Sequence, residues 1–542
     1  MPCVARRRRV LVAELLGLFG NAARCGASPR GSGAHIARTP KAHLAGLVGL
    51  TVAALVAWLA YGMPVGQTLS SAAQGALFGL FPIMWIVVNA LWVYRMTVRT
   101  HHFDILRRSF GRLSADPRIQ ALVVAFCFGA LLEALAGFGA PVAICSVMLV
   151  ALGFDPVRAA VVALVANTAP VAFGAMGTPV VTLAQITGLP LDDVASVVGR
   201  QTPLLALVVP LILVGLVDGR RGVRETWLPA LVCGLAFAFA QFTASNYLSV
   251  QLADIVAALV GAGALVAVPA SRRPAREHVR ASVLTGARSE DLDHEDARPE
   301  VIRAYAPYAF IVAIFSIAQI PPVKDVLDRA TRVFDWPFLN VAGPEGKPVG
   351  ANVFSLPLIS TGGTLVLLAG VCTALALRVR AADAAKEWMA TLHELRFAIL
   401  TVVSVLALAY VMNLSGQAGT IGHFVAAAGA GLAFLSPVLG WFGVAVSGSD
   451  TSANALFGAL QVTAAGQSGL SPELLAAANS SGGVLGKMIS PQNLTIACAA
   501  VGLAGREGDL LRKVLPWSLG LLLVMCLIVV GQSTFVLSWM LP

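Results

Sequence analysis

The sequence predicts an all-α, polytopic membrane protein that has broken or re-entrant helices in two repeat-like halves. The first reason is composition: of 542 residues, 57% are hydrophobic and 12% are charged, whereas about 25% are charged in an average soluble protein. The second is that several apolar runs reach roughly 18 residues or more, enough to cross a bilayer. The third is that two similar glycine- and proline-containing breaks interrupt these runs, as in transporters built from repeats.

The apolar runs predict about 12 membrane spans. In chain order, the expected spans cover residues 44–61, 71–94, 119–153, 156–188, 202–217, 227–241, 252–269, 304–320, 354–377, 396–412, 421–446 and 514–540.

The chain divides into four expected parts: an atypical basic segment (1–43), a first membrane half (44–269), a polar linker (270–303) and a second membrane half (304–542). The first part contains four consecutive arginines followed by an apolar run too short to span. This arrangement resembles the start of a signal peptide. We favour the alternative that an upstream start codon adds these residues, and we expect them to be dispensable.

The charge and cysteine content exclude other classes of protein. The formal net charge is +10, but arginines cluster directly after the second expected span, which predicts a cytoplasmic loop and not a nucleic-acid partner. The eight cysteines show no metal-ligand spacing, so we expect neither disulfides nor a metal. Zinc-protease, nucleophile-elbow and phosphate-loop motifs are incomplete or absent from the sequence, which argues against an enzyme and against ATP as the driving force.

The first broken segment covers residues 129–179. It carries Glu133 within apolar sequence and is interrupted at Gly137, Gly139 and Pro141. Lipid offers no hydrogen bonds, so this loosened backbone is expected to be enclosed by protein or to line a wet cavity. A carboxylate at membrane depth costs about 2.5–3.5 kcal/mol on insertion scales, which makes Glu133 a functional candidate. The alternative is a structural acid satisfied by neighbouring helices.

The second broken segment covers residues 447–454 and 479–491. It contains Asp450 in a run of small residues and ends at Lys487 and Pro491. An offset of 312 residues superposes four identical residues of the two segments and pairs a threonine with a serine. The pairs are Asn167 with Asn479, Gly174 with Gly486, Met176 with Met488, Pro179 with Pro491, and Thr178 with Ser490. If the halves are repeats, these positions converge on one site.

The residue types indicate a site for an organic anion. Half-helix N-termini carry partial positive charge and free N–H groups, and Lys487 adds a full charge. A buried acid such as Glu133 or Asp450 can cycle a proton, so these two are the proton-coupling candidates. Ion pairing with Asp450, or snorkelling to the interface, is the alternative for Lys487. The substrate-binding candidates are Lys487, Asn167, Asn479, Thr178, Ser490, Gly137, Gly139, Ser449, Thr451 and Asn454.

At these motifs the sequence resembles the lactate permease family. The resemblance runs from about residue 44 to 542 and is carried by residues 129–144, 166–180, 447–461 and 479–503. It implies a multi-pass protein of the bacterial inner membrane that imports L-lactate and related 2-hydroxy monocarboxylates, such as D-lactate and glycolate, with a proton and without a cofactor. Residues 1–43 depart from the family, which usually has one more span there. A passive channel for small organic acids is the alternative, and the sequence leaves open the preferred substrate and the oligomeric state.

Overall fold

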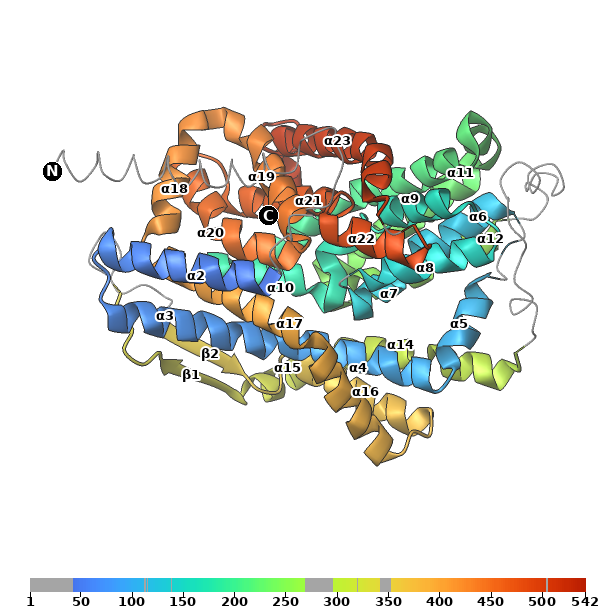
Figure 1. The fold of residues 1–542 in the computed structure, drawn as a ribbon, viewed down its shortest axis with the longest axis horizontal. Helices are drawn as coiled ribbons and strands as arrows, with labels where there is room; N and C mark the ends of the chain where they lie inside the picture. The colour runs from blue at the N-terminus through green and yellow to red at the C-terminus, as the bar shows by residue number, and fades with distance from the viewer. Residues whose placement is uncertain are drawn as a thin grey trace, which may run out of the picture.

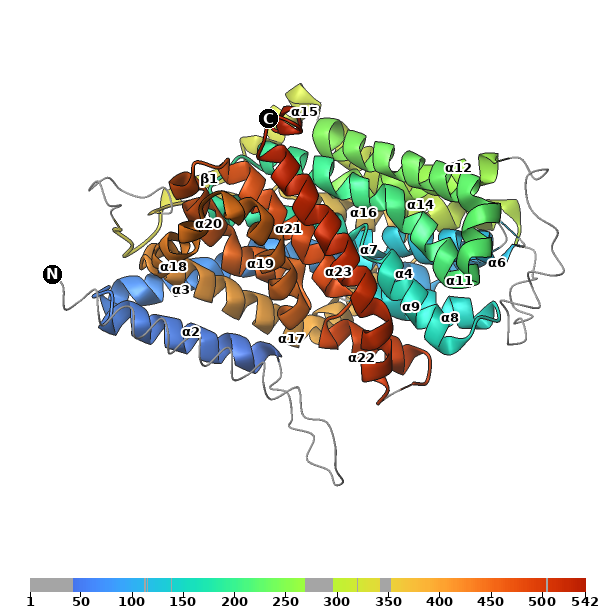
Figure 2. The same ribbon diagram turned by 90° about the horizontal axis from the view of Figure 1, so that it is seen from above.

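A computed structural model describes residues 42–111, 114, 116–137, 139–268, 296–318, 320–341, 352–503 and 505–542. The expectation for the N-terminal segment and most of the expected linker therefore lie outside the described residues. Helices make up almost all of this part of the chain (Figures 1 and 2). They pack around one large hydrophobic core, and a second, small cluster lies where α2 meets α17. In both views α7 (Gly129–Ala136) and α21 (Pro472–Lys487) lie near the centre.

The helices before residue 269 include the first broken segment. In chain order they are α2 (Ala42–Leu59), α3 (Val65–Phe78), η1 (Gly79–Met84), α4 (Trp85–Arg99), α5 (His102–Gly111), α6 (Pro117–Ala121), η2 (Leu122–Phe128), α7, α8 (Ala140–Ala151), α9 (Pro156–Ala166), η3 (Val171–Phe173), α10 (Gly174–Thr187), α11 (Leu191–Thr243), η4 (Ala244–Leu248), η5 (Val250–Leu252) and α12 (Ala253–Ala267).

The elements after residue 295 include the second broken segment. They are α14 (Arg298–Ala318), α15 (Pro321–Asp328), β1 (Thr331–Asp335), β2 (Val353–Pro357), α16 (Gly362–Ala376), α17 (Ala381–Leu414), α18 (Gln417–Val425), η9 (Ala426–Gly431), α19 (Leu432–Ser447), α20 (Asp450–Ser468), α21, α22 (Pro491–Ala500), α23 (Glu507–Gln532) and η10 (Ser538–Met540).

The membrane character follows from helix length and composition. Among the described residues, eight helices are long and apolar enough to cross a membrane, or nine if α9 and α10, bent by 64°, form one span. Three shorter apolar helices, α2, α8 and α16, accompany them. The expected total of about 12 spans is compatible with this set. One span differs from the rest, because the apolar window of Pro117–Leu135 is buried along its whole length.

Helices from before residue 269 pack against helices from after residue 295. α17 packs against α2 and α3, α16 packs against α4, α10 packs against α20, and α11 packs against α21. Figure 2 shows α23 crossing over α19 and α21. The broken segments are therefore enclosed by helices from both parts of the chain, which is the setting that interrupted backbone requires in a membrane.

Caps and prolines explain where several half-helices begin. α9, α21 and α22 each start with proline at the first helical position, where the missing N–H is not needed. The preceding Asp155, Ser471 or Ser490 side chain accepts a hydrogen bond from a backbone N–H of the first turn. Three other helices, α10, α19 and α20, each end at a glycine in the left-handed conformation. These glycines are Gly188, Gly448 and Gly469.

The structure differs from the sequence expectations in two regions. Residues 191–201, which lie between two expected spans, are helical: α11 runs from Leu191 to Thr243 with irregular backbone at Asp218, Gly219 and Thr226. Residues between the expected spans 304–320 and 354–377, and the first residues of the second of these spans, form α15 and the antiparallel strand pair β1 and β2. Phe334 and Phe354 pair across these strands, and the rings of both contact the ring of Trp336, which is a pairing that helical periodicity does not reveal.

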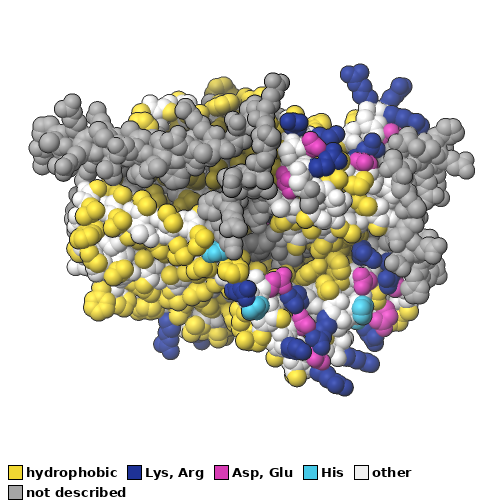
Figure 3. Space-filling model, viewed as in Figure 1, with side chains coloured by type: hydrophobic (Ala, Val, Ile, Leu, Met, Phe, Trp, Pro, Cys, Tyr) yellow, Lys and Arg dark blue, Asp and Glu magenta, His cyan; other side chains and the backbone are white. Residues whose placement is uncertain are grey.

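The surface agrees with a membrane protein that has polar ends. In Figure 3 the face over α2 and α3 is mostly hydrophobic, whereas charged side chains gather around the ends of α16 and α17 and at the turn of α11. Arg95 and Arg99 of α4 pair there with Asp383, Glu387 and Glu394 of α17. These ion pairs join the two halves outside the apolar part of the molecule.

Candidate functional site

A buried ion pair joins the two broken segments. Lys487, the last residue of α21, places Nζ 2.5 Å from Oε1 of Glu133 in α7. Their side chains are only 8% and 3% exposed. Removing two charges from water costs several kcal/mol per ion, which their mutual attraction seldom more than offsets. A pair at such depth is therefore better explained by a functional requirement than by stability. The sequence left open an ion pair between Lys487 and Asp450, but Lys487 pairs with Glu133.

Glycines let backbone approach the Glu133 carboxylate. A Cβ atom on Gly174 would lie 2.7 Å from Glu133 Oε1, and one on Gly137 would lie 3.9 Å from it. Gly137 ends α7 with φ 35°, and Gly139 starts α8 with φ 87°. Both φ values belong to the left-handed region that glycine adopts without steric cost. The break between α7 and α8 thus brings backbone close to the Glu133 carboxylate.

A strained turn, residues 175–177, lies next to the break between α7 and α8. Ala175 and Met176 have φ of 44° and 60°, and Gly177 continues the left-handed run. Left-handed backbone costs roughly 1–2 kcal/mol for each non-glycine residue, and such strain is typical of functional sites. A Cβ on Gly137 would lie 3.5 Å from that of Ala175, so the turn directly adjoins the α7–α8 break.

Asp450 forms a second acidic centre at the α19–α20 break. Its Oδ2 accepts hydrogen bonds from Ser480 Oγ at 2.6 Å and from Asn454 Nδ2 at 3.4 Å. A Cβ on Gly483 would lie 2.3 Å from Asp450 Oδ1. Ser449 caps α20 by accepting from the backbone of the first turn, and Thr451, next to Asp450, is half-buried.

Buried amides connect this centre to the first half. Asn454 Nδ2 donates to the backbone oxygen of Pro179 at 3.1 Å, and Asn479 Nδ2 donates to Asn454 Oδ1 at 2.9 Å. Gln461 Nε2 in turn donates to Asn479 Oδ1 at 3.3 Å. The network makes direct contact between α10, α20 and α21, so the two broken segments share one polar interior.

The paired residues Thr178 and Ser490 make matching hydrogen bonds. Thr178 Oγ1 donates to the carbonyl of Ala175 at 2.5 Å, and Ser490 Oγ donates to the carbonyl of Lys487 at 2.9 Å. The offset of 312 residues relates both the donors and the acceptors. The two segments therefore share local geometry, while Lys487 supplies a charge that Ala175 lacks.

Asn167 is buried but stands outside these networks. It caps the end of α9, and within the described part of the chain neither its Oδ1 nor its Nδ2 has a hydrogen-bond partner. The structure shows no hydrogen bond between Asn167 and Asn479 in the described ranges. Buried polar atoms are normally paired, so this amide is available to a ligand or to water.

Sequence reasoning missed one acid of the site. Asp254 lies in the first turn of α12, is 1% exposed, and accepts a hydrogen bond from Gln241 Nε2 at 3.1 Å. It lies within electrostatic range of Glu133, which repels it, and of Lys487, which attracts it. The sequence contains a signal that identifies Asp254: like Glu133, it is a carboxylate within an apolar segment.

Several polar atoms around these residues have no partner. For the residues that the structure describes, the unpaired buried atoms include Glu133 Oε2, Asp254 Oδ2, Asp450 Oδ1, Ser481 Oγ and both amide atoms of Asn167. An unpaired buried polar group costs roughly 1–3 kcal/mol. Such a concentration of unpaired acceptors and donors is typical of a place that a polar ligand, a proton or water occupies.

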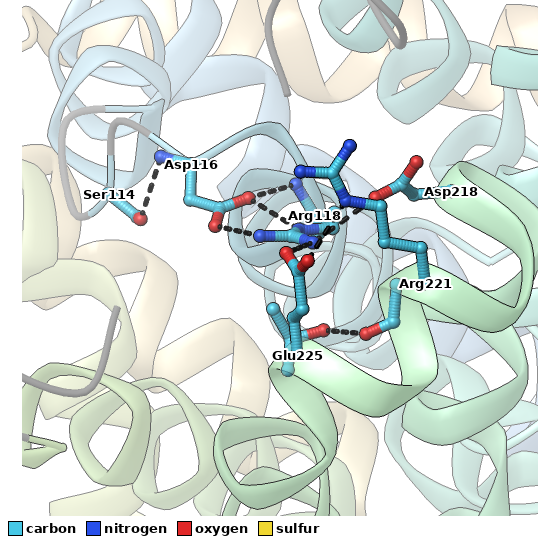
Figure 4. A network of polar contacts seen from close by, with 8 residues as sticks. Ser114, Asp116, Arg118, Asp218, Arg221 and Glu225 are labelled. Carbon is cyan, nitrogen blue, oxygen red and sulfur yellow. Dashed lines mark hydrogen bonds and ion pairs between the residues drawn. The ribbon is translucent and has the colours of Figure 1, made fainter. Parts of the chain in front are cut away.

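A second buried charge cluster lies apart from this site (Figure 4). Arg118, whose side chain is 0% exposed, contacts the carboxylates of Asp116, Asp218 and Glu225 at 2.8–3.1 Å, and Arg221 also contacts Glu225. The cluster ties the start of α6 to the irregular turn of α11. Three carboxylates compensate the charge of Arg118, so we interpret the cluster as a structural link between helices.

The fold and the site together define a membrane transporter. Its helices are broken around a buried interior that contains Lys487, Glu133, Asp254 and Asp450. The chain belongs to the L-lactate permease family, whose model matches residues 34–536. It is therefore a transporter and not an enzyme, and it is a multi-pass protein of the bacterial inner membrane.

Individual relatives agree with this assignment. The L-lactate permease of Bacillus subtilis is 42% identical over 528 residues, covering 93% of each chain. The glycolate permease GlcA of Escherichia coli is 40% identical over 500 residues, covering 88% of this chain and 89% of that protein. Among solved structures, MtrF of Neisseria gonorrhoeae, 13% identical, superposes with a TM-score of 0.50 over 92% of this chain and 96% of its own. That similarity concerns the fold alone.

Proposed function

We propose that this protein is a symporter that imports L-lactate and related 2-hydroxy monocarboxylates, including D-lactate and glycolate, together with a proton. The observation that carries the proposal is the buried pair of Lys487 and Glu133 at the junction of the two broken segments. The names of the relatives, L-lactate permease and glycolate permease, support the substrate class.

The ion pair suggests how a carboxylate binds. A substrate carboxylate can replace Glu133 as the partner of Lys487, because both present oxygen acceptors to one ammonium group. Glu133 therefore holds the place of the substrate in the empty protein. Other buried polar atoms that have no partner among the described residues, on Asn167 and Ser481, would hydrogen-bond the substrate's hydroxyl and second carboxylate oxygen in this proposal.

The charge balance of the site supports proton coupling. One lysine faces three buried acids, Glu133, Asp254 and Asp450. A further anion entering this interior is strongly disfavoured unless a proton enters with it. One proton neutralises one carboxylate, so the transport cycle is expected to be electrically silent.

The other candidate residues would shape the site. In this proposal Asn454, Asn479, Thr178 and Ser490 fix the backbone around it through the hydrogen bonds described above. The breaks at Gly137, Gly139, Ser449 and Thr451 direct the ends of half-helices at the ligand, where their partial charges act on an anion.

Counterflow of labelled L-lactate in proteoliposomes, with and without a pH gradient, tests the proposal. A gradient of about one pH unit stores about 1.4 kcal/mol and supports roughly tenfold accumulation if one proton accompanies each lactate. D-lactate and glycolate are added as competitors to rank the substrates. Accumulation driven by sodium alone would contradict proton symport, and equilibration without accumulation would indicate a passive channel.

A further inference from the structure

Asp254 is a buried acid that forms no ion pair with a lysine, arginine or histidine among the described residues. Its Oδ1 accepts from Gln241 Nε2, which also donates to the backbone oxygen of Ala169 at 3.2 Å. Its Oδ2 has no hydrogen-bond partner among the residues that the structure describes. α12 packs against α7 and α11, and the charged groups that act on Asp254 are Glu133 and Lys487.

The three acids of the interior differ in how their negative charge is compensated. Glu133 contacts the lysine ammonium directly. Asp450 has two side-chain donors, Ser480 and Asn454. Asp254 has one amide donor, and the lysine that attracts it already contacts Glu133. A buried carboxylate with so little compensation is the one that binds a proton most readily.

We propose that Asp254 is the residue that carries the transported proton, while Glu133 serves as the exchangeable partner of Lys487. The inference rests on the proposed function and deepens it. In the empty site, Lys487 is positive and Glu133 and Asp254 are negative. In the loaded site, the substrate carboxylate adds one negative charge and the proton on Asp254 removes one. The net charge of these groups is the same in both states, so neither state is penalised by an additional uncompensated charge.

Gln241 is a positioning residue in this arrangement. Its amide is fixed at two points, the Ala169 carbonyl and Asp254 Oδ1, so it directs the unpaired Oδ2 away from itself. Ala169 lies two residues before the η3 turn, and η3 packs against α21. A change in the broken segment is therefore transmitted to Asp254 through one hydrogen-bonded amide.

The test compares wild type with Asp254→Asn, Asp254→Glu and Asp218→Asn in proteoliposomes. Asp218→Asn is the matched control, since it neutralises a partly buried acid that contacts Arg118 and not Lys487. Two quantities are measured for each protein: exchange of labelled L-lactate at equal pH, and protons taken up per lactate under a pH gradient. The second is a ratio, so it does not depend on how much protein is inserted.

We expect Asp254→Asn to exchange lactate but to lose coupled proton uptake and accumulation. Asp218→Asn should keep the wild-type ratio of protons to lactate. Asp254→Glu, which moves the carboxylate by one methylene, should keep the ratio but shift the pH midpoint of accumulation.

Three results would overturn the inference: an unchanged proton ratio in Asp254→Asn, a parallel loss of exchange and coupling in that variant, or an unchanged pH midpoint in Asp254→Glu. The last readout decides the matter if Asp254→Asn fails to fold. If wild type itself shows no pH-driven accumulation, the proposed symport fails, independently of Asp254.

Discussion

At the scale of single residues, the site depends on how one positive charge is shared. Lys487 forms an ion pair with Glu133 and acts at longer range on Asp254 and Asp450, and it is the one lysine or arginine that does so among the described residues. Its counterpart at the 312-residue offset is Ala175, which has a strained backbone and no charge. The two segments are alike in local geometry and unlike in charge. Binding of an anion is therefore expected to depend mostly on the second half.

Lys487→Met is expected to weaken L-lactate binding by at least about 2 kcal/mol, or roughly 30-fold, because removing one partner of a buried charge pair also leaves the other uncompensated. Competition for labelled lactate during exchange measures this effect. Lys386→Met, which removes an exposed lysine of α17, is the control, and Ala175→Ser should have little effect. Wild-type affinity in Lys487→Met would make Lys487 a structural charge.

At the scale of elements, close helix packing holds the second broken segment in place. A Cβ on Gly440 of α19 would lie 1.9 Å from the backbone oxygen of Asn479 in α21. Cβ atoms on Gly482 and Gly486 would lie 2.1 Å and 2.2 Å from the backbone oxygens of Pro437 and Trp441. Gly482 and Gly486 are one helical turn apart, a spacing of small residues that lets membrane helices approach closely.

Gly482→Ala is expected to destabilise the protein by roughly 1–3 kcal/mol, because a methyl group placed against rigid backbone forces the helices apart. The midpoint of thermal unfolding in detergent, compared with wild type, measures the change. Gly466→Ala in α20 is the matched control, since a Cβ there meets nothing within 4 Å. Equal unfolding midpoints for the two variants would contradict this, because they would mean that α19 and α21 can move apart without loss of stability.

At the scale of the whole molecule, helices from early and late in the chain enclose one interior. Helices from the ranges 44–269 and 304–542 pack against one another through the contacts of α17 with α2 and α3 and of α10 with α20. We propose that these ranges are related halves, supported by the matching hydrogen bonds of Thr178 and Ser490. The family match begins at residue 34, so it includes the last ten residues of the segment 1–43, which was expected to depart from the family.

Deletion of residues 1–40 is expected to leave transport largely intact, since that stretch is basic, glycine-rich and without a full span. The amount of protein in the membrane fraction and the rate of lactate exchange, each relative to the full chain, measure the outcome. Loss of membrane insertion on truncation would instead make the segment a topogenic element.

The sequence by itself determined the class of protein, the positions of the broken segments and the acids and lysine within them, because hydropathy, glycine, proline and charge act locally along the chain. It did not determine which groups meet. Lys487 and Glu133 are 354 positions apart, and only helix packing brings them together.

The tertiary structure also decided three features that local patterns leave open. Asp254 belongs to the site because α12 packs against α7. Residues 191–201 are helical. β1 pairs with β2, and such pairing depends on residues that are not neighbours in the sequence. The left-handed turn at Ala175 and Met176 persists because the surrounding helices enforce a conformation that the residues themselves disfavour.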